Sequence, residues 1–209
     1  MPEPKKYNII LIMTDQHRAD HVSFLPDSRM STPNLDRIAE SVGFSNCNSV
    51  NPICTPARTA LLTGKYTHQI GMLAMSGDLS LQHPTYMQAL QKAGYWTAGI
   101  GKFHWLQNWP WSASPGTGHD LFALKPEIMK YGLDYVWEAS GKQLAVKNYC
   151  DYCKHLESKG ILEKFRRHIE SCGRNSQDPE KTSFDGNPWP FDEEDYIDIV
   201  TGGEILKAI

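Results

Sequence analysis

An apolar segment near the start of the chain, residues 7–14, most constrains the fold. It reads Tyr-Asn-Ile-Ile-Leu-Ile-Met-Thr, and the polar residues Asp15 and Gln16 follow it directly. A short run this rich in isoleucine is typical of a central strand that is buried on both faces of a parallel sheet. Open α/β sheets place their ligands at the carboxyl ends of such strands. The sequence therefore predicts an α/β fold with a mostly parallel central sheet, helices on both faces, and a site near Asp15.

A thiol stands at the start of a second segment, which predicts a short helix. Thr55 can cap this helix, Pro56 suits its first position, and Gly64 can end it. Backbone N–H groups and the positive end of the helix dipole would then face the Cys54 side chain and any oxyanion bound there. Arg58 adds a guanidinium one turn later. The alternative is a small buried cysteine beside a surface arginine, which is the commoner fate of a single cysteine.

A third segment places a lysine and a histidine at the end of a strand. The sequence predicts a helix over residues 85–93, a turn at Gly94, and then a short strand that ends at Lys102 and His104. Two residues apart on an extended chain, these two side chains are expected to point to the same side. Either residue alone is more often a surface or a satisfied core residue, so the functional interpretation depends on the pair.

Together these segments resemble the sulfatase family, which belongs to the alkaline phosphatase-like superfamily. The Cys-x-Pro-x-Arg pattern at residues 54–58, with Leu-Thr-Gly at 62–64, is similar to the signature of that family. The Gly-Lys-x-His element at 101–104 and the Thr-Pro-Asn-Leu-Asp sequence at 32–36 agree with the family in order and spacing. The resemblance covers the amino-terminal part of the family's domain, and it implies an alkaline phosphatase-like α/β sandwich.

The resemblance implies hydrolysis of small-molecule sulfate esters. Cys54 would be oxidised to formylglycine by a separate formylglycine-generating enzyme, and one hydroxyl of the hydrated aldehyde would attack sulfur while the other later expels sulfate. Arg58 and Lys102 would balance the charge of the ester's anionic oxygens. His104 would hold the hydrate or transfer a proton. A thiol phosphatase is the weaker interpretation, because Cys54 and Arg58 are too close for the phosphate-cradling loop of that chemistry.

The resemblance also implies a divalent metal, held by Asp15, Gln16 and residue Cys54. Calcium is the expected ion, with magnesium or manganese as alternatives. Gln16 stands where the family most often has a second aspartate, and it offers a carbonyl oxygen with one negative charge fewer. In this respect the chain is similar to some phosphonate and phosphate ester hydrolases of the same superfamily. A phosphonate or phosphate diester hydrolase is therefore the alternative activity.

The family's domain continues beyond the length of this chain, which has 209 residues. Residues 1–209 are expected to form its amino-terminal part, with the core and the site motifs in 1–104 and an irregular and helical extension in 105–209. The extension predicts an exposed helix over 155–171 and a capped helix over 196–209. In the family a further strand and a second pair of metal ligands follow. We therefore expect an incomplete metal site and an open sheet edge, and a catalytically incomplete fragment that needs a partner chain is the second alternative.

Composition excludes several classes of function. The residues are 40% hydrophobic and 22% charged, which suits a globular core, and the net charge of -3 provides no basic field for nucleic acid. No signal peptide or membrane-spanning pattern is visible, so we expect a cytoplasmic location and no membrane partner. Five cysteines, an odd number, argue against a fully paired disulfide framework. Cys150 and Cys153 form a lone C-x-x-C pair, for which two reduced thiols are a stronger interpretation than a zinc site.

Overall fold

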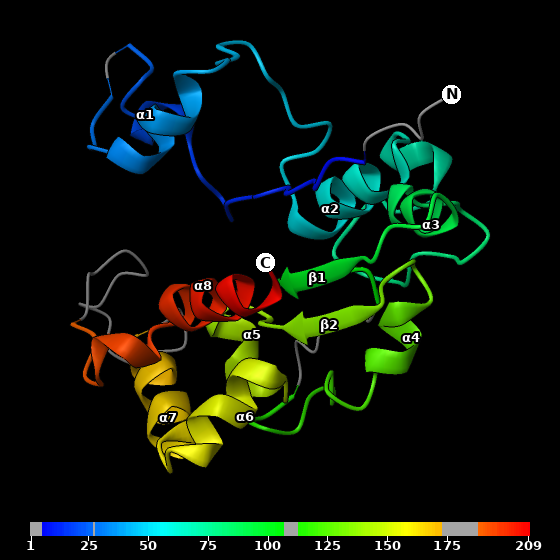
Figure 1. Ribbon diagram of the computed structural model, residues 1–209. Coiled ribbons are helices and arrows are strands. Elements are labelled where there is room, and N and C mark those ends of the chain that lie inside the picture. The colour runs from blue at the N-terminus through cyan, green and yellow to red at the C-terminus, as the bar shows by residue number, and fades with distance from the viewer. Residues whose placement is uncertain (1–5, 27, 107–112, 173–187) are drawn as a thin grey trace, which may run out of the picture. The chain divides into compact units, whose positions relative to one another are not determined.

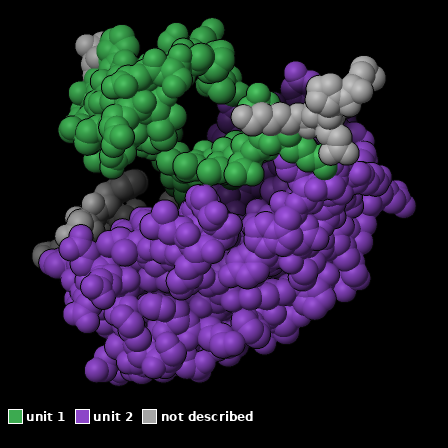
Figure 2. All heavy atoms as spheres, viewed as in Figure 1, with its two compact units in different colours: residues 1–48 green, residues 49–209 purple. Residues whose placement is uncertain are grey.

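The computed structural model describes residues 6–26, 28–106, 113–172 and 188–209. The chain divides into two compact units, residues 1–48 and residues 49–209, which Figure 2 shows in different colours. Each unit has its own internal contacts. The division of the site motifs from the extension at residue 104 stays a prediction.

The first unit is organised by polar contacts around one short helix. Helix α1 spans Pro33–Ala39, with Thr32 as its N-cap residue and a proline in its first position. The hydroxyl of Ser23 accepts a hydrogen bond from the Thr32 N–H at 2.6 Å and donates to the Asp36 carboxylate at 2.8 Å. A short 3-10 helix, η1 (Ala19–His21), precedes these residues. The hydrogen bonds therefore tie the chain at residue 23 to the first turn of α1.

The strand expected over residues 7–14 is not formed. This segment lies in no helix or strand, and its apolar side chains are exposed, with Ile10 at 57% and Ile12 at 64%. A strand that is buried on both faces needs a hydrogen-bonded neighbour on each side, because its backbone N–H and C=O groups must be paired. In the described part of the chain, strands occur only in the second unit, where they pair with each other. The prediction of a strand over residues 7–14 was therefore wrong for the described residues.

The second unit is built on a pair of parallel strands, which lie side by side in Figure 1. Strand β1 spans Ala98–Gly101 and strand β2 spans Tyr135–Glu138, in a register that aligns Gly101 with Glu138. Both strands run in the same direction, so their carboxyl ends meet at the same edge. The structure thus confirms the expected strand before Lys102 and places the end of a second strand beside it.

Helix α3 leads into β1 as the sequence predicted. It spans Tyr86–Lys92, and the Thr85 hydroxyl caps it by accepting a hydrogen bond from the Gln88 N–H at 3.0 Å. The Gln88 side chain accepts in return from the Thr85 N–H at 3.1 Å, which completes a capping box. Gly94 then has a φ of +78°, in the left-handed region that favours glycine. The turn between α3 and β1 is therefore determined by its own residues.

Further helices of the second unit lie against this strand pair or against one another. Figure 1 shows α8 (Ile197–Ala208) beside β1 and α4 (Lys125–Met129) beside β2, and these elements are in contact. The remaining elements are α2 (Cys54–Thr63), η2 (Thr67–Gln69), α5 (Lys142–Lys147), α6 (Asp151–Ser158), α7 (Leu162–Cys172) and η3 (Glu193–Asp195). Helix α8 confirms the helix expected near residue 209. None of the helices in the described ranges is both long enough and apolar enough to cross a membrane.

The helix expected over residues 155–171 is in fact two helices. Helix α6 ends at Ser158 and helix α7 begins at Leu162. Gly160 lies between them with a φ of +69°, in the left-handed region in which helices commonly end. The dense charge pattern continues across this break, so the pattern alone predicted one helix. A single glycine divides the segment into two helices.

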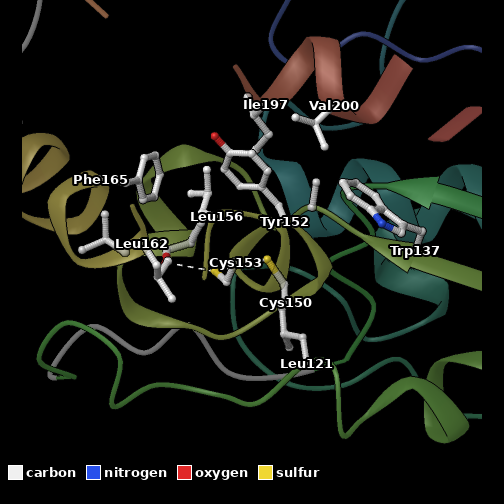
Figure 3. Packing of buried hydrophobic residues seen from close by; sticks show 13 residues of the cluster. Leu121, Trp137, Cys150, Tyr152, Cys153, Leu156, Leu162, Phe165, Ile197 and Val200 are labelled. Atoms are coloured by element: carbon white, nitrogen blue, oxygen red, sulfur yellow. Dashed lines mark hydrogen bonds between the residues drawn. The ribbon is translucent and has the colours of Figure 1, made fainter. Parts of the chain in front are cut away.

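The larger of two buried apolar clusters receives side chains from β2 and from the helices that follow it (Figure 3). Tyr152 and Phe165 pack edge to face in this cluster, with their ring centroids 5.7 Å apart, and both are fully buried. Cys150 and Cys153 also belong to it, as free thiols with their Sγ atoms 3.6 Å apart. The burial of this apolar surface is the main stabilising contribution to the second unit.

Candidate active site

The segment that carries Cys54 forms helix α2 and ends as predicted, at Gly64 with a φ of +66°. Its start differs from the expectation, because the N-cap residue is Ile53 rather than Thr55. The N–H groups of the first turn of a helix have no partner within the helix, so a proline is accepted at several positions there. Pro56 accordingly occupies the third helical position instead of the first. Cys54 itself is thus the first residue of the helix.

Cationic side chains lie close to this cysteine. The ammonium group of Lys102 donates to Cys54 Sγ at 3.6 Å. The guanidinium group of Arg58 donates through Nη1 to the carbonyl oxygen of Lys102 at 2.6 Å. Arg58 is buried, at 8% exposure, while Cys54 and Lys102 are partly buried. Helix α2 and the end of β1 therefore bring together three of the residues that the sequence singled out.

His104 lies two residues beyond Lys102, in a strained backbone conformation. Its φ is +57°, in the left-handed region that is uncommon for residues other than glycine. The backbone is therefore not extended here, and the expectation that the two side chains point to the same side does not apply. The imidazole is buried, at 5% exposure, and lines a small cavity together with Glu138. Conformations of this kind persist where the surrounding structure holds them, and they are frequent in active sites.

Glu138, the last residue of β2, was not singled out from the sequence. Its carboxyl group is buried and accepts a hydrogen bond from the Phe103 backbone N–H, while its Oε1 atom has no hydrogen-bond partner in the described part of the chain. Burial raises the pKa of this carboxyl well above its ordinary value, and the neighbouring Cys150 adds to the rise. The signal that could have found it is similar to the one that pointed to Lys102, namely a polar residue at the carboxyl end of an apolar strand.

Asp151, at the start of α6, fixes the end of β2. Its Oδ2 atom accepts a hydrogen bond from the Glu138 backbone N–H at 2.8 Å, and its Oδ1 atom accepts one from the ammonium group of Lys125 in α4 at 2.5 Å. The Asp151 side chain is 8% exposed and that of Lys125 is 23% exposed. An ion pair with so little exposure depends on both partners, since removal of one leaves the other without its counter-ion.

Replacing Asp151 by leucine is expected to lower the free energy of unfolding by about 2–4 kcal/mol. The change leaves the Glu138 N–H without its acceptor and Lys125 without its counter-ion. Urea unfolding followed by circular dichroism measures the loss. Glu127→Ala is the matched control, because its ion pair with Lys130 is exposed and such pairs contribute at most about 1 kcal/mol. Equal losses in the two variants would contradict the role assigned to Asp151.

The predicted metal ligands Asp15 and Gln16 lie in the first unit, where both are exposed. They offer oxygen atoms, the donor type that calcium prefers, but calcium takes about six to eight such ligands. Among the described residues, no group of three or more His, Cys, Asp or Glu side chains could hold a metal ion. Asp15 and Gln16 therefore offer the donor atoms that calcium prefers, but they do not form a complete site by themselves.

The surroundings of residue 54 suit an anionic ligand. Cys54 is the first residue of a helix of 10 residues, so the N–H groups of that first turn place a partial positive charge beside it. Lys102 adds a full positive charge at the sulfur, and Arg58 adds a second one at the Lys102 carbonyl. A nucleophilic position next to fixed positive charge is the arrangement that stabilises attack on an anionic ester.

Comparison with known proteins gives relatives that are much longer than this chain. The N-acetylglucosamine-6-O-sulfatase of Bacteroides thetaiotaomicron is 36% identical over 152 residues, which are 70% of this chain and 26% of that protein. The ulvan-active sulfatase of Formosa agariphila is 38% identical over 138 residues, which are 66% of this chain and 25% of that protein. The chain thus spans about a quarter of the length of these relatives.

A solved structure, of a protein in complex with its substrate D-glucosamine-2-N,6-O-disulfate, is 40% identical in sequence with a TM-score of 0.47. Its alignment covers 50% of this chain and 21% of the other. The model of the sulfatase family matches residues 7–179, a range that includes every site residue predicted from the sequence. That match confirms the predicted α/β class of the alkaline phosphatase-like kind. Because it covers far more than half of the residues, this chain belongs to the sulfatase family.

Proposed function

We propose that this chain carries the nucleophile of an enzyme that hydrolyses sulfate esters. The proposal rests above all on the position of Cys54, the first residue of α2, with the Lys102 ammonium 3.6 Å from its sulfur. Family membership supports the proposal, because residues 54–58 and 101–104 hold the motifs that resemble those of sulfatases. The matched relatives are themselves named as sulfatases, which gives further support.

In this proposal the nucleophile is a formylglycine made from Cys54. The CH2–SH group gains an oxygen from water, releases its sulfur as hydrogen sulfide, and gives a pair of electrons and two protons to an oxidant such as dioxygen. A separate formylglycine-generating enzyme would carry out this conversion. When hydrated, the aldehyde supplies a hydroxyl group for attack on the ester's sulfur, which splits the hydrolysis into two easier steps.

The remaining side chains have distinct roles in this proposal. Lys102, which contacts residue 54, would bind the anionic oxygens of the ester. Arg58 would add positive charge while it holds the Lys102 carbonyl. His104 is buried and lies two residues after Lys102. It would hold the nucleophilic hydroxyl or transfer a proton.

A divalent cation is part of the proposal, with calcium as the first candidate and magnesium or manganese as alternatives. Asp15 and Gln16 would supply two of its oxygen ligands, and other residues would have to supply the rest. A bound cation would neutralise the oxygens of the ester. The cytoplasmic location expected from the sequence stays a prediction.

Two observations favour other functions. Gln16 in place of a second carboxylate favours a phosphonate or phosphate diester hydrolase of the same superfamily. The exposed apolar segment at residues 7–14 favours a fragment that becomes active only with a partner chain. The experiment that tests the proposed function also separates these alternatives from it.

The chain is expressed with and without a formylglycine-generating enzyme. With that enzyme, intact-protein mass spectrometry is expected to show a decrease equal to the difference between a CH2–SH and a CHO group at Cys54. The converted chain is then expected to hydrolyse para-nitrophenyl sulfate faster than bis-para-nitrophenyl phosphate in buffer that contains calcium. The unconverted chain, which retains the thiol, provides the matched control.

Each outcome of this experiment supports one function. Faster hydrolysis of the phosphate diester would favour the alternative activity. If the converted chain hydrolyses neither ester and isothermal titration calorimetry detects no calcium binding, the fragment interpretation is supported and the enzymatic one is rejected for the chain alone.

A further inference from the structure

We propose that Glu138 is a positioning residue of this site: it and Arg58 hold one peptide unit of the chain from opposite ends. That unit joins Lys102 to Phe103, directly before His104. The inference rests on the proposed function, because it concerns the placement of two residues that would act on the ester. Glu138 lies outside every motif recognised in the sequence.

Both polar groups of this peptide unit are engaged. Its carbonyl oxygen, from Lys102, accepts a hydrogen bond from Arg58 Nη1 at 2.6 Å. Its N–H group, from Phe103, donates to the Glu138 carboxyl. The two groups point in opposite directions on a planar unit, so two such hydrogen bonds prevent the plane from rotating. Arg58 belongs to α2 and Glu138 to β2, so the unit is held between two separate elements.

The orientation of this plane determines the positions of the residues on either side. The contact between Lys102 Nζ and Cys54 Sγ depends on where the Lys102 backbone lies. On the other side, His104 keeps its left-handed φ of +57° only where the surrounding structure holds it. Phe103 itself is buried, and its ring packs against Trp105 with the centroids 4.9 Å apart. A misplacement of about 1 Å in groups of this kind can reduce a reaction rate by about a hundredfold.

The backbone of Glu138 is itself firmly held. It aligns with Gly101 in the parallel register of β1 and β2. The N–H of the next residue, Ala139, donates to the Gly101 carbonyl at 3.0 Å. The N–H of Glu138 donates to Asp151 at 2.8 Å. The carboxyl that holds the Phe103 N–H therefore projects from a fixed point at the end of the sheet.

A carboxyl group at this position lowers the stability of the fold, which argues for a role in the site. Glu138 is only 1% exposed, and its Oε1 atom has no hydrogen-bond partner among the described residues. Burying an incompletely bonded polar group is unfavourable, whereas a leucine would suit a cavity that is also lined by Leu121 and Ile128. Buried titratable groups of this kind are concentrated at functional sites.

The test compares Glu138→Leu with Glu138→Gln in the full chain after conversion of Cys54. In Glu138→Leu, the hydrogen exchange rate of the Phe103 amide, followed by NMR, is expected to rise by at least about tenfold while that of Ala139 stays unchanged. The kcat/KM for para-nitrophenyl sulfate is expected to fall by about 10- to 100-fold. Glu138→Gln keeps an acceptor oxygen and is expected to restore both values. Glu138→Met serves as the apolar variant if the leucine variant does not fold.

Asp195→Asn is the matched control. Asp195 is another buried acid, at 2% exposure, but it pairs with His155 and Lys159. Its replacement is expected to lower the melting temperature and to leave both the Phe103 exchange rate and the kcat/KM unchanged. If Asp195→Asn changes the Phe103 exchange rate and the kcat/KM as Glu138→Leu does, the two readouts report general destabilisation. The inference would then be overturned.

Two results bear on Glu138 itself. Unchanged Phe103 exchange in Glu138→Leu overturns the hydrogen bond to the peptide unit, whether or not the chain hydrolyses an ester. Faster exchange with an unchanged kcat/KM overturns the positioning role. An unmodified or inactive wild-type chain counts against the proposed function, and the exchange measurement still decides whether Glu138 holds the peptide.

Discussion

Replacing Cys54 by alanine is expected to abolish hydrolysis of para-nitrophenyl sulfate by the converted chain, with a decrease in kcat of at least about a thousandfold. The substitution removes the precursor of the proposed nucleophile, whereas the positively charged side chains of Arg58 and Lys102 and helix α2 remain. Cys54 is only partly buried and is the first residue of α2, so loss of its sulfur leaves no large cavity. The melting temperature is therefore expected to change little, and the comparison separates chemistry from folding.

Cys172→Ala is the matched control for this prediction. Cys172 is also a partly buried free cysteine of the second unit, at the end of α7, and belongs to no motif of the site. Its replacement is expected to leave both the rate of hydrolysis and the mass decrease unchanged. Substantial activity in Cys54→Ala would show that a group other than residue 54 is the nucleophile.

The free energy of unfolding is expected to fall as the pH rises above about 4.5, through the contribution of Glu138. Its folded-state pKa is raised well above the ordinary value of 4.5, chiefly by burial. At a pH between the unfolded and the folded pKa, the folded chain holds a proton that the unfolded chain has released. Raising the pH therefore favours unfolding, by up to about 1.4 kcal/mol for each pH unit, until the folded pKa is passed.

Glu138→Gln isolates this contribution, because glutamine does not titrate. The difference in the free energy of unfolding between the variant and the wild type, measured by urea unfolding, is expected to grow in favour of the variant between pH 5 and 8. The groups that act on Glu138 are Cys150 and Asp151, which raise its pKa, and the Phe103 N–H and Arg58, which lower it. His104 lines the same cavity. A difference that stays constant with pH would mean that the carboxyl ionises as readily in the folded chain as in the unfolded one.

Local signals in the sequence predicted several elements of this structure correctly. Helix α3 lies within the predicted range 85–93 and is followed by the predicted turn at Gly94, and Gly64 ends α2. In each case the residue that carries the signal acts on groups within one turn of it, so the outcome depends little on the rest of the fold. The motif at residues 101–104 likewise begins at the last residue of a strand, β1, as predicted.

Other expectations failed because they depended on distant residues or on one competing local signal. Residues 7–14 have the pattern of a buried strand, but a strand forms only with a paired neighbour. Helix α2 begins at Cys54 because the first helical turn accepts Pro56 at more than one position. The predicted helix over 155–171 is divided at Gly160, whose left-handed conformation outweighs the charge pattern.

The sequence by itself determined the family of this protein and the residues that surround its proposed nucleophile, because these are carried by short motifs whose members lie close together along the chain. Only the tertiary structure decided how that site is held. The parallel pairing of β1 with β2 brings Glu138 to the Phe103 N–H, and the packing of α2 brings Arg58 to the Lys102 carbonyl. Both contacts join residues far apart in sequence, and their strength depends on burial, which arises only when the strands and helices pack together.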